Sequence, residues 1–210
     1  MIFNLGALRG YIRNKTILFE LLKLYGLSNV QLDDLLKVIT GKTGGQLFSS
    51  THRFIKNRKE LIVTPEAINQ DTSIVINDIE ELKKAYGIDS AEFINVDDAF
   101  EIPADPSIAC VDSLKLKFPL IIRKWKAGDH FYPLGMRQKK KLSDYFIDKK
   151  YSILVKEKKL ILETDGKIVW IFGDRIDNRF RVTKSTTKVL IIKTRKNPFV
   201  IKRLNQTKNL

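Results

Sequence analysis

Residues 159–172 read K-L-I-L-E-T-D-G-K-I-V-W-I-F, and this stretch does most to decide the fold. Two apolar runs, residues 159–163 and 167–172, flank the dipeptide Asp165-Gly166. Asp-Gly between apolar runs is typical of a two-residue β-hairpin, because both residues adopt positive φ angles with little strain. The sequence therefore predicts an antiparallel hairpin within a strand-rich region.

The sequence on both sides of this hairpin is also rich in strand signals. Residues 116–125 and 188–193 are apolar runs that predict further strands. Between the first run and the hairpin, Ser143 is expected to cap a short helix over Tyr145, Phe146 and Ile147. The C-terminal half should therefore be a mainly β domain with one short helix.

The first 60 residues have a helical period instead. Apolar residues at helical spacing predict a helix from a cap at Thr16 to a stop at Gly26. Ser28 and Gln31 then form an S-x-x-Q capping box, which predicts a second helix ending at Gly41. Both signals point to a helical N-terminal unit.

Short strands follow these helices. Residues 48–55 and 61–63 surround the polar turn 57–59 and predict a hairpin. The fold class is therefore α+β: a helical N-terminal unit with a hairpin, then a strand-rich C-terminal domain with a short helix. The two units should have separate cores, containing Leu21, Leu35 and Phe54 in the first and Ile121, Phe146, Trp170 and Ile191 in the second.

The charge pattern suggests where these units are joined. Residues 61–119 carry 12 acidic and 4 basic groups, whereas residues 120–160 carry 12 basic and 4 acidic groups. Pro103 and Pro106 interrupt the acidic part. The expected division is a helical domain at 1–65, an acidic connector at 66–105, a C-terminal domain at 106–196 and a basic flexible tail at 197–210.

The composition excludes several classes of protein. The 210 residues have a net charge of +14, a single cysteine and two histidines. One cysteine cannot form an internal disulfide, and two distant histidines cannot build a histidine-rich metal site. Thr40-Gly41-Lys42-Thr43 resembles the end of a phosphate-binding loop, but Leu36 stands where its first glycine is required. We therefore expect no catalytic residues, cofactor site or metal site in this chain.

No apolar run approaches the length of a membrane span, and the N-terminus has no signal-peptide pattern. The expected location is the cytoplasm, with no membrane partner. The strong positive charge indicates instead a polyanionic partner.

Basic residues concentrate in residues 123–150, where they alternate with Trp125, Phe131 and Tyr132. The aromatic side chains are expected to lie in the core, whereas the cations face solvent and contact nucleic-acid phosphates. Free N–H groups at the helix start near Ser143 would add to this anion site. The predicted phosphate contacts are Arg123, Lys124, Lys126, Arg137, Lys139, Lys140 and Lys141.

The same stretch carries a resemblance to a known family. Residues 123–150, with R-x-W-K-x-G-D-x-F-x-P-L-G-M followed by K-K-L-S-D-Y-F-I-D, resemble the C-terminal domain of tRNA(Ile)-lysidine synthetases, as does I-V-W-I-F-G-D-R-I-D-N-R-F at 168–180. Residues 22–65, with G-G-Q-L-F-S-S-T-H and L-I-V-T-P, are similar to the middle, substrate-binding region of that family.

The resemblance implies a function. The family ligates lysine to the wobble cytidine of a minor isoleucine tRNA, using ATP with magnesium in an N-terminal ATP-pyrophosphatase domain. That domain's S-G-G-x-D-S loop is absent here, and Thr43-Gly44-Gly45-Gln46 continues as Leu47-Phe48 instead. The chain is thus expected to be the tRNA-recognition portion of an ATP-dependent ligase and inactive alone. Its partners would be tRNA and, for the parent enzyme, lysine and ATP.

Three interpretations remain open at this point. The chain is a fragment or a natural truncation of the ligase, a stand-alone RNA-binding module without enzymatic activity, or a self-contained hydrolase or nucleotide enzyme. The missing catalytic motifs disfavour the last.

Overall fold

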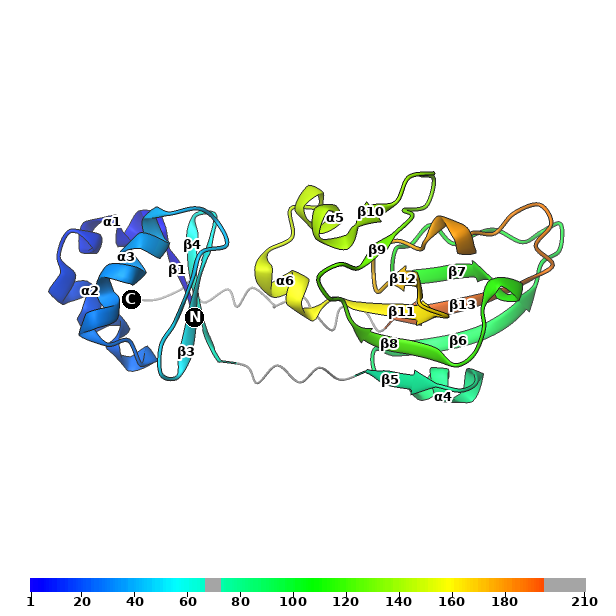
Figure 1. Cartoon of the computed structure of the whole chain (residues 1–210), viewed down its shortest axis with the longest axis horizontal. Coiled ribbons are helices and arrows are strands. Elements are labelled where there is room, and N and C mark those ends of the chain that lie inside the picture. The colour runs from blue at the N-terminus through cyan, green and yellow to red at the C-terminus, as the bar shows by residue number, and fades with distance from the viewer. Residues whose placement is uncertain (67–72, 195–210) are drawn as a thin grey trace, which may run out of the picture. The chain divides into compact units, whose positions relative to one another are not determined.

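The chain contains two compact units, Met1–Gln70 and Asp71–Leu210. The structure is a computed structural model that describes residues 1–66 and 73–194 (Figure 1). Each unit combines helices with antiparallel strands, which confirms the predicted α+β class. The predicted tail at 197–210 lies outside the described residues.

The N-terminal unit is a four-stranded antiparallel sheet with helices on one side (Figure 1). The strand order is β1-β4-β3-β2, so the first strand of the chain pairs with the last strand of the unit. The elements are β1 (Ile2–Asn4), α1 (Leu5–Ile12), α2 (Lys15–Leu22), η1 (Lys23–Tyr25), η2 (Asn29–Gln31), α3 (Leu32–Thr40), β2 (Gln46–Phe48), β3 (His52–Asn57) and β4 (Glu60–Pro65).

The predicted capping box is present, whereas the predicted cap at Thr16 is wrong. The Ser28 backbone N–H donates to Gln31 Oε1 at 3.2 Å, and Gln31 ends the 3-10 turn that leads into α3. Helix α2 starts earlier than expected, because Asn14 caps it by accepting from the backbone N–H of Ile17. Thr16 therefore lies inside the helix.

The core of the N-terminal unit lies between the helices and the sheet. Leu35 and Phe54 are fully buried, as predicted, and they pack with Leu18 and Leu22. Leu21 is 42% exposed, so its predicted place in the core is wrong. Leu21 and Ile17 lie at the edge of the apolar face of α2, outside the part of the helix that is covered by the core.

The C-terminal unit contains two larger sheets, β12-β11-β8-β5 and β6-β13-β7, and the two-stranded ribbon β9-β10. All of the strand pairs are antiparallel. The elements are β5 (Ile74–Ile76), α4 (Ile79–Lys84), β6 (Ile88–Asn95), β7 (Ile108–Asp112), η3 (Ser113–Lys115), β8 (Leu120–Lys124), β9 (His130–Phe131), β10 (Lys140–Lys141), α5 (Leu142–Asp148), α6 (Ile153–Lys158), β11 (Leu160–Thr164), β12 (Lys167–Ile171), η4 (Asn178–Phe180) and β13 (Lys188–Thr194).

The hairpin predicted around Asp165-Gly166 is present. Thr164 pairs with Lys167, which leaves two residues in the turn. Asp165 has φ 49° and Gly166 has φ 68°, as a two-residue hairpin of this twist requires. This turn places the side chains of Asp165 and Lys167 at the same end of the sheet.

The acidic connector predicted at 66–105 is wrong for most of its length. Strand β5 pairs with β8, and β6 pairs with β13, so both are integral to the sheets of the C-terminal unit. Ile88 and Ala91 of β6 are buried while Asp89 and Glu92 between and beside them are exposed. A count of charges reports the exposed residues of such a strand and misses the buried ones.

The C-terminal core consists of separate clusters. Trp170 belongs to the largest, Phe146 to a second one with Phe131, and Ile191 to a third. Ile121 is only partly buried. None of these clusters shares a residue with the core of the N-terminal unit, which agrees with the predicted separation. In residues 1–66 and 73–194, none of the helices has both the length and the apolar character of a membrane span.

Candidate nucleic-acid interface

The ribbon β9-β10 brings the two halves of the predicted basic stretch together. Lys141 pairs with His130 and Lys140 pairs with Phe131. The backbone N–H of Leu142 donates to the carbonyl of Asp129 at 2.9 Å and closes this arrangement. Residues separated by about ten positions in the sequence therefore lie on one small piece of antiparallel structure.

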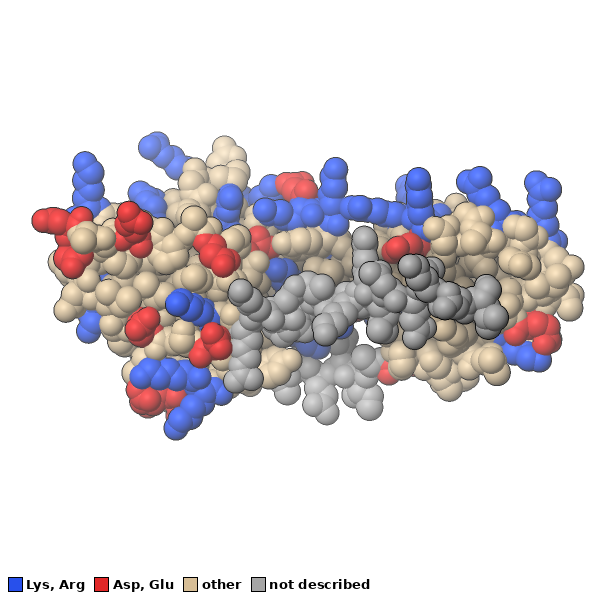
Figure 2. All heavy atoms as spheres, turned by 180° about the vertical axis from the view of Figure 1, so that it is seen from behind, with Lys and Arg blue, Asp and Glu red and all other residues tan. Residues whose placement is uncertain are grey.

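Four of the seven predicted phosphate contacts are exposed and form no ion pair within the part of the chain that the structure describes. We call these four residues the ribbon cations: Lys126, Arg137, Lys139 and Lys141. Figure 2 shows that many Lys and Arg side chains project from the surface of each unit. Exposed cations without a carboxylate partner are available to an external anion.

Lys140 and Lys124 are placed differently. Lys140 is partly buried and forms an ion pair with Asp148 at the end of α5. Lys124 lies on β8 and is also partly buried. An anion that used Lys140 would compete with Asp148, so its contribution should be smaller than that of a ribbon cation.

Arg123 does not face solvent, which corrects its predicted place on the surface. Its side chain is 15% exposed and donates to both oxygens of Asp129, at 2.8 and 2.9 Å. It also donates to Glu163 on the neighbouring strand β11, at 2.5 Å. These hydrogen bonds raise the pKa of the Arg123 guanidinium, and the one to Asp129 has the largest effect. The residue joins β8, β11 and the turn at 126–129.

The aromatic residues of this stretch serve mainly as core, as predicted. Phe131 is fully buried, and Trp125 packs edge-on against Phe146 with ring centroids 5.2 Å apart. The indole N–H of Trp125 donates to the carbonyl of Lys156 at 2.5 Å. Tyr132 lies beneath the guanidinium of Arg179, 4.8 Å from the ring centroid. These contacts fix the backbone from which the cations project.

The expected helix cap at Ser143 is wrong by two residues. Helix α5 starts at Leu142, its N-cap position is Lys141, and no side chain caps it. Ser143 Oγ instead contacts Asp144 Oδ1 at 3.2 Å. The N–H of Leu142 already has a partner in the carbonyl of Asp129, so this helix start contributes less to an anion site than predicted.

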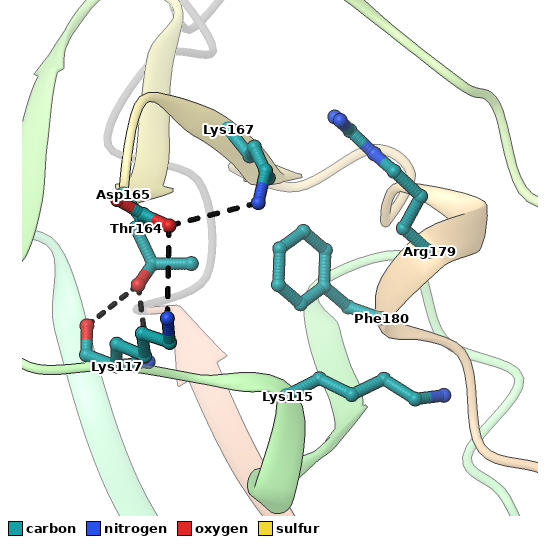
Figure 3. A pocket seen from close by; sticks show the side chains of 7 residues that line it. All are labelled: Lys115, Lys117, Thr164, Asp165, Lys167, Arg179 and Phe180. Atoms are coloured by element: carbon teal, nitrogen blue, oxygen red, sulfur yellow. Dashed lines mark hydrogen bonds and ion pairs between the residues drawn. The ribbon is translucent and has the colours of Figure 1, made fainter.

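A small basic pocket in the same unit was not predicted. It has a volume of about 190 Å³ and is lined by Lys115, Lys117, Thr164, Asp165, Lys167, Arg179 and Phe180 (Figure 3). Asp165 lies 3.9 Å from Lys117 Nζ and 3.6 Å from Lys167 Nζ. These cations come from three distant segments, so no local sequence pattern marks them. The pocket adds four basic side chains to the C-terminal unit.

A buried polar cluster in this unit is centred on Asp174. It accepts from the hydroxyls of Tyr145 at 2.6 Å and Tyr151 at 2.5 Å, and it lies 3.4 Å from Lys159 Nζ. Burial raises the pKa of both tyrosines and lowers the pKa of Lys159. Each member has a partner, so the cluster joins α5 and the residues on either side of α6 to the turn that follows β12.

The described residues contain no group of three or more potential metal ligands from His, Cys, Asp and Glu. Cys110 is buried on β7, where burial raises the pKa of its thiol to about 11. The ribbon cations and the basic pocket place positive charge at the surface of this unit.

Comparison with known families assigns both units. Residues 1–66 match the model of the TilS substrate binding domain, and residues 120–192 match that of the TilS substrate C-terminal domain. The ribbon cations and Lys167 and Arg179 of the basic pocket lie within the second match.

Named relatives agree with these matches. The tRNA(Ile)-lysidine synthase of Parabacteroides distasonis is 39% identical over 189 residues, which are 90% of this chain and 43% of that protein. That of Bacteroides thetaiotaomicron is 35% identical over 85% of this chain and 39% of that protein. A crystal structure of a TilS C-terminal domain has a TM-score of 0.45 and 23% identity, covering 51% of this chain and 83% of the other.

The chain thus spans less than half the length of these two synthases. Its two matched regions occur on one chain, the substrate-binding region before the C-terminal one. The chain belongs to the tRNA(Ile)-lysidine synthase family, of which it carries the substrate-binding and C-terminal domains.

Proposed function

We propose that this chain is the tRNA-recognition portion of a tRNA(Ile)-lysidine synthase and that it binds tRNA through phosphate contacts. The observation that carries the proposal is the position of the ribbon cations: four exposed basic side chains, without an ion pair in the described residues, that lie within the match to the C-terminal domain of this family. Lys141 lies on β10, and the other three precede β9 or β10 in the chain, so the pairing of these two strands brings their segments together.

The chemistry of tRNA favours contacts of this kind. The stems of tRNA are A-form helices with a deep, narrow major groove that side chains read poorly. Phosphate, ribose and shape contacts therefore dominate, and lysine and arginine supply them. The aromatic residues near the ribbon pack inside the unit, so base stacking is not the main source of affinity.

Lysidine formation itself belongs to the longer protein in this proposal. The parent enzyme would be an ATP-dependent C–N ligase of the cytoplasm that joins lysine to a wobble cytidine. Its ATP, magnesium and lysine would bind in an ATP-pyrophosphatase domain outside these residues, while this chain holds the tRNA. Of the seven predicted phosphate contacts, Arg123 would have a structural role, the four ribbon cations would contact the RNA, and the partly buried Lys124 and Lys140 would contribute less.

A direct binding measurement tests the proposal. Fluorescence anisotropy with a labelled isoleucine tRNA transcript, repeated over a series of salt concentrations, should give a slope of log affinity against log salt of about −3 or steeper if four or more phosphates are contacted. A DNA duplex of the same charge should bind more weakly, because its groove geometry differs. Absence of tRNA binding at low salt would refute the proposal.

A further inference from the structure

The turn between β9 and β10 carries two exposed apolar side chains. Leu134 and Met136 are each 41% exposed. They belong to a run of exposed residues, 134–139, which also contains the ribbon cations Arg137 and Lys139. Single apolar residues are common at protein surfaces and need no function. These two differ because they precede ribbon cations directly in the chain and because their backbone is fixed.

Hydrogen bonds hold this turn to the segment that follows β12. The backbone N–H of Leu134 donates to the carbonyl of Ile176 at 3.2 Å, and that of Gly135 donates to Asn178 Oδ1 at 3.1 Å. The backbone N–H of Asn178 donates in return to the carbonyl of Tyr132 at 2.7 Å. The turn is therefore bonded at several points to a segment more than 40 residues away in the chain.

The anchoring segment is itself fixed by Asp177, whose side chain is completely buried. Its Oδ2 accepts from the backbone N–H of Tyr132 at 2.9 Å. The carboxylate also accepts from the guanidinium of Arg179, at 2.8 and 3.0 Å. Arg179 is engaged in this anchor, so it is not available to a partner in the way that a ribbon cation is. The turn therefore keeps its shape without a ligand.

Gly135 leaves the outside of the turn open. Its φ angle is 85°, a conformation that glycine adopts without strain. A Cβ atom placed on Gly135 would meet no atom of the described chain within 4 Å. A partner can therefore approach the backbone between Leu134 and Met136 closely.

The charge around the turn indicates the kind of partner. Residues 134–143 contain four basic residues and no acidic one. Lys140 is paired with Asp148, and the other three are ribbon cations. Met136 directly precedes Arg137, so a molecule with a phosphate on Arg137 lies beside Met136 as well. Nucleic acid has the matching chemistry, because apolar ribose surfaces lie between its phosphates.

We infer that Leu134 and Met136 lie against riboses in the minor groove of an A-form stem, and that this contact distinguishes RNA from B-form DNA. The inference rests on the proposed function and adds to it a contact that does not depend on charge. The minor groove of A-form RNA is wide and shallow and displays its riboses, whereas that of B-DNA is only about 6 Å wide. Side chains on a short turn reach the riboses of the first groove and not those of the second.

Three double variants of the full chain test this inference. Leu134→Ala/Met136→Ala shortens both side chains. Ile102→Ala/Leu114→Ala is its matched control, since both residues are apolar and exposed in the same unit but lie outside the turn. Leu134→Met/Met136→Leu exchanges the two side chains and keeps the turn apolar. Equal thermal midpoints would establish that all three variants are folded.

We expect Leu134→Ala/Met136→Ala to weaken binding of tRNA and of an RNA duplex about tenfold, because apolar surface is no longer buried. The loss should be the same at every salt concentration, since no cation is removed and the slope of log affinity against log salt is set by phosphate contacts. Affinity for a DNA duplex of the same sequence should not change, so the preference for RNA should fall by the same factor. The control and the exchange variant should bind nearly as the wild-type chain does.

The outcomes separate this inference from the proposed function. If the wild-type chain binds tRNA but the alanine variant of the turn binds as tightly as its control, or loses equal affinity for RNA and DNA, the inference fails alone. A flatter salt slope in that variant would mean that the turn only places Arg137 and Lys139, and would also overturn it. Binding of the wild-type chain to phosphatidylglycerol vesicles, lost in the alanine variant, would assign the two side chains to a membrane surface instead. If the wild-type chain does not bind tRNA, the proposed function fails and this inference fails with it.

Discussion

The Arg123 guanidinium donates two parallel hydrogen bonds to the Asp129 carboxylate, at 2.8 and 2.9 Å. Both side chains are nearly inaccessible to solvent, with exposed fractions of 15% and 8%. Asp129 also accepts from the backbone N–H of Lys126 at 2.8 Å, which closes the turn before β9. This buried ion pair beside the ribbon thus shapes the surface and is not part of it.

Arg123→Ala should therefore destabilise the C-terminal unit. Removing one partner of a buried pair leaves Asp129 and Glu163 without their shared cation, and the expected loss is about 3 kcal/mol of unfolding free energy. Urea denaturation measures this loss. Lys126→Ala is the control and should change stability by less than about 0.5 kcal/mol, because Lys126 is exposed. Equal stability of the two variants would contradict the structural role of Arg123.

The Asp174 cluster should make stability depend on pH in the alkaline range. Burial raises the pKa of Tyr145 and Tyr151 above the ordinary value of 10.0. As the pH rises past that value, the unfolded tyrosines lose protons while the folded ones retain them. The stabilising contribution of the two hydroxyls is therefore fully present below a pH of about 10 and falls above it.

The double variant Tyr145→Phe/Tyr151→Phe isolates the contribution of the two tyrosines. Lys159 also titrates at alkaline pH, but it is present in both chains, so its effect cancels when their stabilities are compared. Near neutral pH the variant should be less stable than the wild-type chain by about 1 kcal/mol for each hydrogen bond removed. Above a pH of about 10 the difference should narrow, because only the wild-type chain has the two hydroxyl protons. Denaturation midpoints at a series of pH values measure this. A constant difference from neutral to alkaline pH would show that the two hydroxyls titrate normally.

Cys110 should be unreactive in the folded chain. Its side chain is 4% exposed and burial raises its pKa to about 11, so little thiolate forms near neutral pH. We expect a thiol reagent to label the native chain slowly and the denatured chain at once. Rapid stoichiometric labelling of the native chain would mean that β7 opens readily.

The parts of the fold that could be predicted well from the sequence are those with local signals. The Ser28–Gln31 box and the Asp165-Gly166 turn each depend on residues within a few positions, and both are present. The acidic stretch was misinterpreted, because β5 and β6 are placed by pairing with β8 and β13, far along the chain. Such pairing leaves no trace in local composition.

The candidate site could likewise be predicted only where its signals are local. A run of basic residues predicts a charged stretch, but it does not show which cations have carboxylate partners. Arg123 and Lys140 have such partners, and the partner Glu163 of Arg123 lies 40 residues away. The basic pocket was missed for the complementary reason, since its cations come from three segments that are distant in the sequence.

This chain alone should not carry out lysidine formation. Thr40 and Gly41 end helix α3, with the Gly41 N–H donating to the carbonyl of Lys37 at 2.8 Å, so they do not form a phosphate-binding loop. We expect no transfer of labelled lysine to tRNA and no tight binding of ATP by calorimetry. Either activity in this chain would place catalytic groups within these residues and would require a different assignment.

The measurement that tests the central claim most directly compares tRNA binding by two quadruple alanine variants. One removes the ribbon cations Lys126, Arg137, Lys139 and Lys141. The other removes Lys84, Lys184, Lys188 and Lys193, which are exposed in the same unit but lie on or near α4 and the β6-β13-β7 sheet. Both have the same net charge, and matching thermal midpoints would establish that both are folded.

If the ribbon binds tRNA phosphates, the salt slope of the first variant should be flatter by at least about two units, and it should bind markedly more weakly than the second. Equal affinity and equal salt slope of the two variants would contradict the account.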